Sequence, residues 1–181
     1  MNHYTVTAKT LHWLMALLLI GLFTLGVYMH ELPLSPRKLQ LYSWHKWAGA
    51  TAFLLVALRL AWRLAHRPPA LPDAMPRLVR RVASATHGLL YLLMFAIPLS
   101  GWLMSSAKGF QTVYFGVLRL PDLLAKDAAL GDALLQVHFS LNMLFAVLVI
   151  GHAGAALKHH FIDRDDILAR MLPRRTTEKQ S

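Results

Sequence analysis

The chain has 181 residues, of which 56% are hydrophobic and 15% are charged, and it contains no cysteine. A chain this apolar and this short is typical of a membrane domain with several spans and not of a soluble enzyme. The lack of cysteine excludes disulfides, iron–sulfur clusters, thiolate metal sites and c-type haem attachment. If the protein has a metal or redox role, its ten histidines are the strong ligands that remain, and they limit the possible cofactors to b-type haem, zinc or copper.

The formal net charge of +10 is high enough to suggest nucleic-acid binding. The lysines and arginines, however, avoid the apolar runs and gather at their ends, which is the pattern of membrane topology. We therefore expect a lipid bilayer, and no nucleic acid, as a partner.

The first apolar run predicts a helix over residues 10–29, with His12 and Trp13 near its start. From Leu11 onward the run is uncharged and long enough to cross the hydrocarbon. No small-residue cleavage site follows it, so we interpret it as a retained helix and not as a signal peptide.

A second helix is predicted over residues 39–64. Trp44 and Trp47 flank His45, as in an aromatic belt at the membrane interface. Arg59 and Arg63 lie in the last turns, from which arginines can snorkel to the membrane surface without breaking the span.

Residues 67–76 contain four prolines and predict a loop. A third helix follows over residues 78–105, with His87 near its start, and Pro98 predicts a kink within it. The connection over residues 107–131 is the longest, and its apolar residues could lie in the interface or fold back on the bundle.

The fourth helix is predicted over residues 132–161, beginning at Asp132, whose charge suits a helix N-terminus. Residues 163–173 predict a short surface helix, and a polar tail follows. We therefore expect a transmembrane domain over residues 1–162 and a surface helix with a tail over residues 163–181.

The cations near the helix ends predict the orientation. One side collects Lys9, Arg59, Arg63, Arg67, Arg77, Arg80, Arg81, Lys158, Arg164, Arg170, Arg174, Arg175 and Lys179. The other side collects Arg37, Lys38, Lys46, Lys108, Arg119 and Lys126. By the positive-inside rule, both termini are cytoplasmic. The fold expected is an all-α, up-and-down four-helix bundle that spans the membrane.

Two histidines bracket the uncharged run of the fourth helix, His138 and His152. Fourteen helical residues advance about 21 Å and return to nearly the same face, so both imidazoles point the same way near opposite sides of the membrane. Depth places His45 beside His138 on the periplasmic side. On the cytoplasmic side, either His12 or His87 could pair with His152.

A buried histidine in lipid is costly unless it is paired. One such residue could simply form an interhelical hydrogen bond, but four at matched depths favour metal ligation. This is the arrangement that holds two flat metal cofactors, one above the other, in a diheme electron carrier. Arg59 lies 14 residues after His45 and could contact a haem propionate or snorkel to lipid phosphate.

Basic residues near the cytoplasmic side suggest a second site. His159 lies seven residues after His152, on nearly the same face. With His87 and Arg80 or Arg81, it could surround a quinone head group, whose reduction needs proton donors. The same residues have a topological reason to lie there.

Several segments together carry a family resemblance. They are Leu11-His12-Trp13, His45 with Gly49, Thr86-His87-Gly-Leu-Leu-Tyr91, Ala96-Ile-Pro98 with Gly101, Ile150-Gly-His-Ala-Gly-Ala-Ala-Leu-Lys-His-His160 and Ile167-Leu-Ala-Arg-Met-Leu-Pro-Arg-Arg175. In these segments, which follow one another along nearly its whole length, the chain resembles the prokaryotic cytochrome b561 family.

The resemblance implies two b-type haems, with iron ligands His12 and His152 on the cytoplasmic side and His45 and His138 on the periplasmic side. It also implies superoxide oxidation coupled to ubiquinone reduction in the bacterial inner membrane. For an anionic donor, Lys46 is the cation singled out because it adjoins His45, although lysines are common at membrane interfaces.

Three hypotheses follow. The leading one is a superoxide:ubiquinone oxidoreductase that relays single electrons from the periplasmic face to the quinone pool. The second is a cytochrome b anchor subunit that takes electrons from a periplasmic dehydrogenase or a soluble cytochrome. The third is a non-redox membrane protein whose histidines bind zinc.

Overall fold

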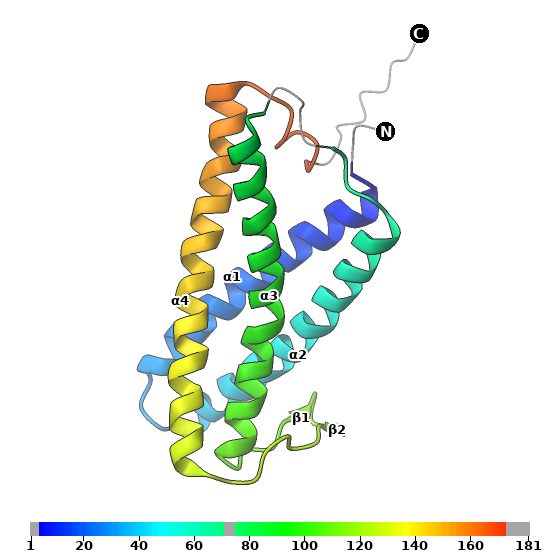
Figure 1. Cartoon of the computed structure of the whole chain (residues 1–181). Helices are drawn as coiled ribbons and strands as arrows, with labels where there is room; N and C mark the ends of the chain where they lie inside the picture. Colours follow the sequence, from blue (N-terminus) through cyan, green and yellow to red (C-terminus); the bar gives the residue numbers. More distant parts are fainter. Residues whose placement is uncertain (1–3, 71–74, 173–181) are drawn as a thin grey trace.

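The computed structural model describes residues 4–70 and 75–172. Its four long helices are α1 (Val6–Glu31), α2 (Pro36–Ala65), α3 (Arg77–Ala107) and α4 (Ala128–Lys158). Each is long and apolar enough to cross a membrane, for which about 20 residues suffice. The helices run alternately up and down (Figure 1). The prediction of a four-helix membrane bundle is confirmed.

Three helices, α1, α2 and α4, start earlier than predicted because a capping side chain precedes each of them. The hydroxyl of Thr5 accepts from the amide of Ala8, and the carboxylate of Asp127 accepts from Leu130, so each satisfies a free amide of the first turn. The predicted start of the fourth helix at Asp132 is wrong. Asp132 lies within α4 and forms an ion pair with Lys108 at 2.9 Å.

The helices pack in chain order, α1 on α2, α2 on α3 and α3 on α4. Figure 1 shows α3 and α4 side by side and the pair α1 and α2 inclined to them. We call the end that holds the start of α1 the terminal end, and the end that holds the two short strands the hairpin end.

The buried centre of the bundle is apolar. Met15 of α1 and Val56 of α2 are 1% and 0% exposed, and they form a cluster with Met94 of α3. Phe145 of α4 packs against this cluster, midway between His138 and His152 in the sequence. An apolar layer therefore separates the two ends of the bundle.

The connection between α3 and α4 forms a small hairpin, whose strands β1 (Val113–Tyr114) and β2 (Leu118–Arg119) pair antiparallel. Phe115 and Gly116 make the turn with φ of 49° and 74°, the left-handed backbone of tight hairpins. The indole of Trp47 in α2 donates to the carbonyl of Val113 at 2.6 Å. The hairpin is thereby fastened to α2.

The segment after α4 is not the predicted surface helix. A π-helical turn, His159–Asp163, ends α4, and residues 166–172 form bends and turns. Side chains of α1 hold this segment, since Trp13 donates to the carbonyl of Met171 at 3.0 Å and Lys9 to that of Leu172 at 2.9 Å. The predicted tail from residue 173 lies outside the described residues.

Candidate functional site

A histidine pair joins α2 and α4 at the hairpin end. The ring centroids of His45 and His138 lie 6.5 Å apart, and their planes are inclined by 82°. Both residues are half-buried. The structure thus brings together the two histidines that depth alone had paired.

Three histidines gather toward the terminal end. The rings of His12 and His152 have centroids 6.3 Å apart, whereas those of His87 and His152 are 5.2 Å apart. His152 therefore has both of its predicted neighbours, one from α1 and one from α3.

These distances can be compared with the spacing that a shared metal requires. An imidazole nitrogen binds a metal at about 2.0–2.1 Å. The ring centroid lies about 1.2 Å behind that nitrogen, so two imidazoles on opposite sides of one metal have centroids about 6.4 Å apart. The pairs His45–His138 and His12–His152 fit this spacing at 6.5 Å and 6.3 Å. The His87–His152 pair, at 5.2 Å, is too close, which favours His12.

The surroundings of His138 select one tautomer. Its Nδ1 lies 3.0 Å from the carbonyl oxygen of Ile97 and 2.9 Å from the hydroxyl of Ser100. Because a carbonyl only accepts, Nδ1 carries the proton. Nε2 then keeps its lone pair, the state in which an imidazole binds a metal, and the bond at Nδ1 orients the ring.

Two glycines allow helices to approach the rings of the hairpin-end pair. A Cβ at Gly101 would lie 3.1 Å from Cε1 of His138, and one at Gly26 would lie 3.4 Å from Cε1 of His45. Among the described residues, Nδ1 of His45 is buried and has no hydrogen-bond partner, an arrangement that costs about 1–3 kcal/mol. The structure therefore holds both imidazoles in close-fitting surroundings and holds His45 at an energetic cost.

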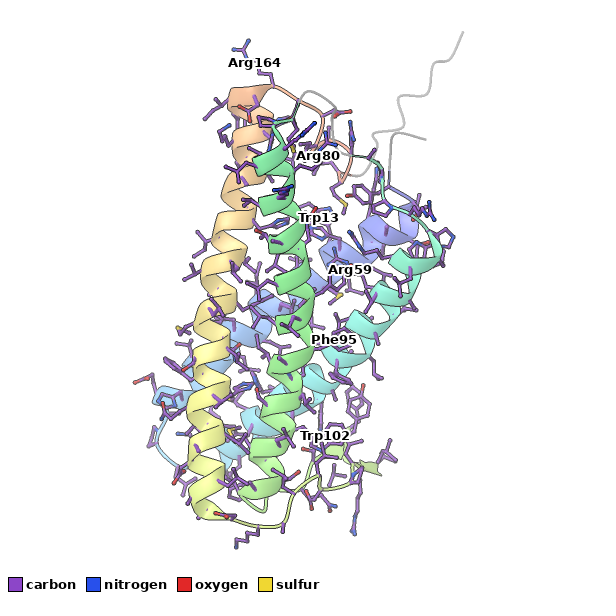
Figure 2. The ribbon with its side chains drawn as sticks, in the orientation of Figure 1. Trp13, Arg59, Arg80, Phe95, Trp102 and Arg164 are labelled. Carbon is purple, nitrogen blue, oxygen red and sulfur yellow. The ribbon has the colours of Figure 1, made fainter. Side chains whose placement is uncertain are left out.

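Arg59 of α2, labelled in Figure 2, lies beside the histidines of the terminal end and contacts His12. Its Nη2 lies 2.9 Å from Nδ1 of His12, and because a guanidinium only donates, Nδ1 must accept. A metal bound through Nε2 of His12 would leave the ring proton on Nδ1, which could no longer accept from Arg59. Metal binding would therefore release Arg59 for an anionic group nearby, such as a haem propionate.

Lys46 lies under the loop that carries the hairpin. Its ammonium group donates to the carbonyl of Phe110 at 2.8 Å. Lys46 also lines a cavity of about 200 Å³, together with Trp47 of α2 and with Gln111 and other residues of the loop. The structure thus places this cation at a hollow of the hairpin end, next in sequence to His45.

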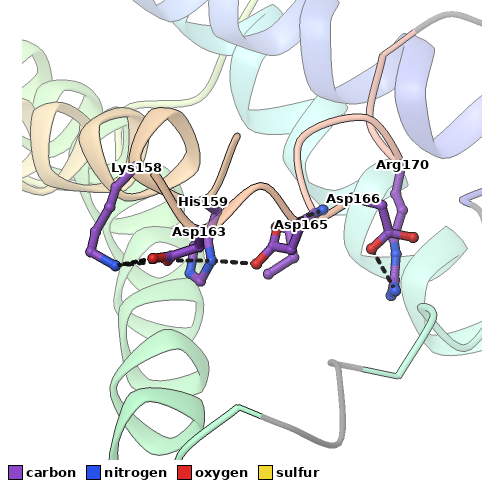
Figure 3. A network of polar contacts seen from close by, with 7 residues as sticks. Lys158, His159, Asp163, Asp165, Asp166 and Arg170 are labelled. Carbon is purple, nitrogen blue, oxygen red and sulfur yellow. Dashed lines mark hydrogen bonds and ion pairs between the residues drawn. The ribbon is translucent and has the colours of Figure 1, made fainter. Parts of the chain in front are cut away.

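The residues predicted to surround a quinone lie at the terminal end. His87 contacts His152, and Arg80 lies in the first turns of α3 (Figure 2). Figure 3 shows that His159 is held by carboxylates, with Nδ1 2.6 Å from Asp165 and 3.2 Å from Asp163. These polar contacts of His159 thus come from its own segment and not from His87.

Sequence reasoning missed Ser100, Gly26 and the hairpin. Ser100 is 6% exposed in an apolar helix, two residues after the internal proline Pro98. A polar residue beside a proline inside an apolar helix is a signal that could have drawn attention to it. Nothing in the local sequence marks Gly26, because its role depends on the ring of another helix.

Four apolar helices that hold histidine pairs toward both ends define a multi-pass membrane protein of the cytochrome b class. The chain belongs to the prokaryotic cytochrome b561 family, whose model matches residues 3–174. It is therefore a membrane electron-transfer protein of a family that binds haem b.

Two similar proteins match this chain over nearly their whole length, and a third matches it over about half. Cytochrome b561 homolog 2 of Escherichia coli (strain K12) is 37% identical over 187 residues, which cover 98% of this chain and 95% of the relative. Cytochrome b561 homolog 1 of the same organism is 27% identical, over 97% of this chain and 99% of the relative. A protein of Yersinia pestis named probable superoxide oxidase CybB is 34% identical over 95 residues, about half of each chain, 52% and 53%.

Proposed function

We propose that the protein binds two haem b groups and relays single electrons between the periplasmic face of the bacterial inner membrane and ubiquinone. His12 and His152 would bind one iron, and His45 and His138 the other. The observation that carries the proposal is the centroid spacing of 6.3 Å and 6.5 Å in two pairs that share α4.

Bound haem b would supply one-electron transfer. The residues of the chain supply the conditions for it. Two histidines would hold each haem iron and would keep small molecules off the metal. The hydrogen bond of His138 to Ile97 fixes the ring orientation, and Arg59 provides a positive charge beside His12.

The positive-inside rule supports a cytoplasmic terminal end, because most lysines and arginines near the span ends lie there. The hairpin end is then periplasmic, and Lys46 lies on the side where an electron donor arrives. A cation at that surface would attract an anion such as superoxide. The name of the partial Yersinia pestis relative supports this donor.

On the cytoplasmic side, His87 is the residue we propose to act on ubiquinone, because it contacts His152 but lies too close for the two rings to hold one metal from opposite sides. Arg80 and His159 lie at the same end. A histidine there could donate a proton as the quinone is reduced. The activity proposed is superoxide oxidation coupled to ubiquinone reduction.

The test has two measurements on the purified protein. A haem-to-protein ratio of two, with the optical spectrum of bis-histidine haem, is expected; a colourless protein would eliminate the proposal and favour a zinc site. Superoxide is then supplied and ubiquinone reduction is followed. Turnover only after addition of a periplasmic dehydrogenase would favour the anchor subunit.

Substitution of one ligand tests the pairing. We expect His138→Ala to lose about half of the haem and to keep the centre at the terminal end. The control is His30→Ala, which removes an exposed histidine at the hairpin end of α1 and should keep both haems. Full haem content in His138→Ala would contradict the ligand assignment.

A further inference from the structure

A second hollow lies at the terminal end, beside Arg59. It is a cavity of about 260 Å³ between the start of α1, the end of α2 and Tyr91 of α3. Arg59 and Arg63, one helical turn apart on α2, line it together with Arg67, which follows the end of α2. Three guanidinium groups therefore surround one small volume.

The aromatic residues of the cavity hold two of these cations in place. The guanidinium carbons of Arg59 and Arg63 lie 5.4 Å and 5.7 Å from the ring centroid of Tyr91, within the range of cation–π contacts. Another wall is rigid, because the indole of Trp62 stacks on His66 with a centroid distance of 4.0 Å. The guanidinium groups of Arg59 and Arg63 thus both lie beside Tyr91, a residue that lines the cavity.

No carboxylate neutralises this group of cations within residues 4–70 and 75–172. The ion pairs there involve Lys108, Lys158, His159 and Arg170, and none involves Arg59, Arg63 or Arg67. Like charges held this close repel one another, and a bound anion would remove the repulsion. The planar fork of guanidinium suits the oxygens of a phosphate group.

The position of the cavity identifies the source of the phosphate. The cavity lies at the end of α2, a helix long and apolar enough to span a membrane, and Pro68, Pro69 and Met171 add apolar surface to its lining. A site with cations and apolar walls at a membrane surface suits a lipid head group with its first methylenes better than a free ion. Basic pockets between membrane helices bind anionic head groups in this way.

We propose that Arg63 and Arg67 bind the phosphate of an anionic phospholipid in the leaflet at the terminal end. Arg59 forms the inner wall and is left to the haem propionate proposed above. The inference does not depend on the electron donor or acceptor, because it concerns the outer part of the cavity alone.

The test measures lipid retention by the haem-loaded protein. Wild type and the double variant Arg63→Gln/Arg67→Gln are reconstituted with equal amounts of phosphatidylglycerol and phosphatidylcholine and transferred to detergent. Native mass spectrometry then determines which lipid stays bound. We expect one phosphatidylglycerol on the wild type and about thirtyfold weaker binding after the loss of two cations.

A matched control separates the cavity from general surface charge. Arg77→Gln/Arg81→Gln removes the same charge, with the same spacing, from exposed positions in the first turns of α3, and it should retain the lipid. Arg63→Lys/Arg67→Lys should bind more lipid than the glutamine variant, because it keeps both charges. An unchanged haem spectrum and melting temperature establish that the variants fold.

Three outcomes would overturn the proposal. They are undiminished lipid binding by Arg63→Gln/Arg67→Gln, equal loss in the Arg77→Gln/Arg81→Gln control, and displacement of the lipid by millimolar inorganic phosphate. If the double variant does not fold, each single variant is measured. Lipid retention equal to that of wild type in both single variants would also overturn the proposal.

Discussion

The contact between Gly101 and the ring of His138 is the tightest fit in the hairpin-end site, and Gly101→Ala tests it. The added methyl group would lie 3.1 Å from Cε1 and 3.3 Å from Nδ1 of His138. The ring would have to move by a few tenths of an ångström. Its hydrogen bonds to Ile97 and Ser100, now 3.0 Å and 2.9 Å long, would then approach or exceed the usual limit of about 3.2 Å.

Two opposing free-energy terms decide whether Gly101→Ala stabilises or destabilises the site. Overpacking of this kind costs about 1–3 kcal/mol, whereas replacing glycine by alanine inside a helix gains up to about 1 kcal/mol. The expected balance is a destabilised site, because the strained neighbour is a ring held by two hydrogen bonds and not a flexible chain. We expect Gly101→Ala to lose haem from the hairpin end when the detergent-purified protein is diluted.

The assay is the haem-to-protein ratio with the reduced-minus-oxidised spectrum, measured for a graded series. Gly26→Ala meets His45 at an ordinary contact of 3.4 Å and should keep most of its haem. Gly88→Ala, on the same helix as Gly101, has no neighbouring atom within 4 Å and should match wild type. Full haem retention by Gly101→Ala, or equal loss across the three variants, would refute the reasoning.

Three further predictions concern other residues. Ser100→Ala removes the hydroxyl beside Nδ1 of His138 and should weaken haem binding at that end about 10–100-fold; haem loss on dilution measures this, and Ser100→Thr, which keeps a hydroxyl, is the control. His87→Ala should keep both haems yet lower ubiquinone reduction, and loss of one haem would identify His87 as a ligand instead. Gly116→Ala places a side chain at a φ of 74°, so it should destabilise the hairpin by about 1–2 kcal/mol. Hydrogen exchange at residues 113–118 measures this effect, and Gly21→Ala, a helical position with no atom within 4 Å, should leave the exchange unchanged.

Some features of the protein follow from local physics and could be predicted from the sequence. A span needs only about 20 apolar residues, so the four helices could be recognised one by one. The helical repeat places His138 and His152 on one face whatever surrounds α4. The ends of the elements were harder to predict from the sequence, because the cap Asp127 and the turns after Asp163 depend on single hydrogen bonds.

The sequence by itself determined the four spans, the histidines at matched depths and the concentration of cations at one end, since each depends on residues close together in the chain. Only the tertiary structure decided that the ring centroid of His152 lies 6.3 Å from that of His12 and 5.2 Å from that of His87. It also decided that Ser100 and Gly101 adjoin His138. The physical reason is that depth in a membrane is a one-dimensional property, whereas the distance between two side chains depends on how their helices cross and pack.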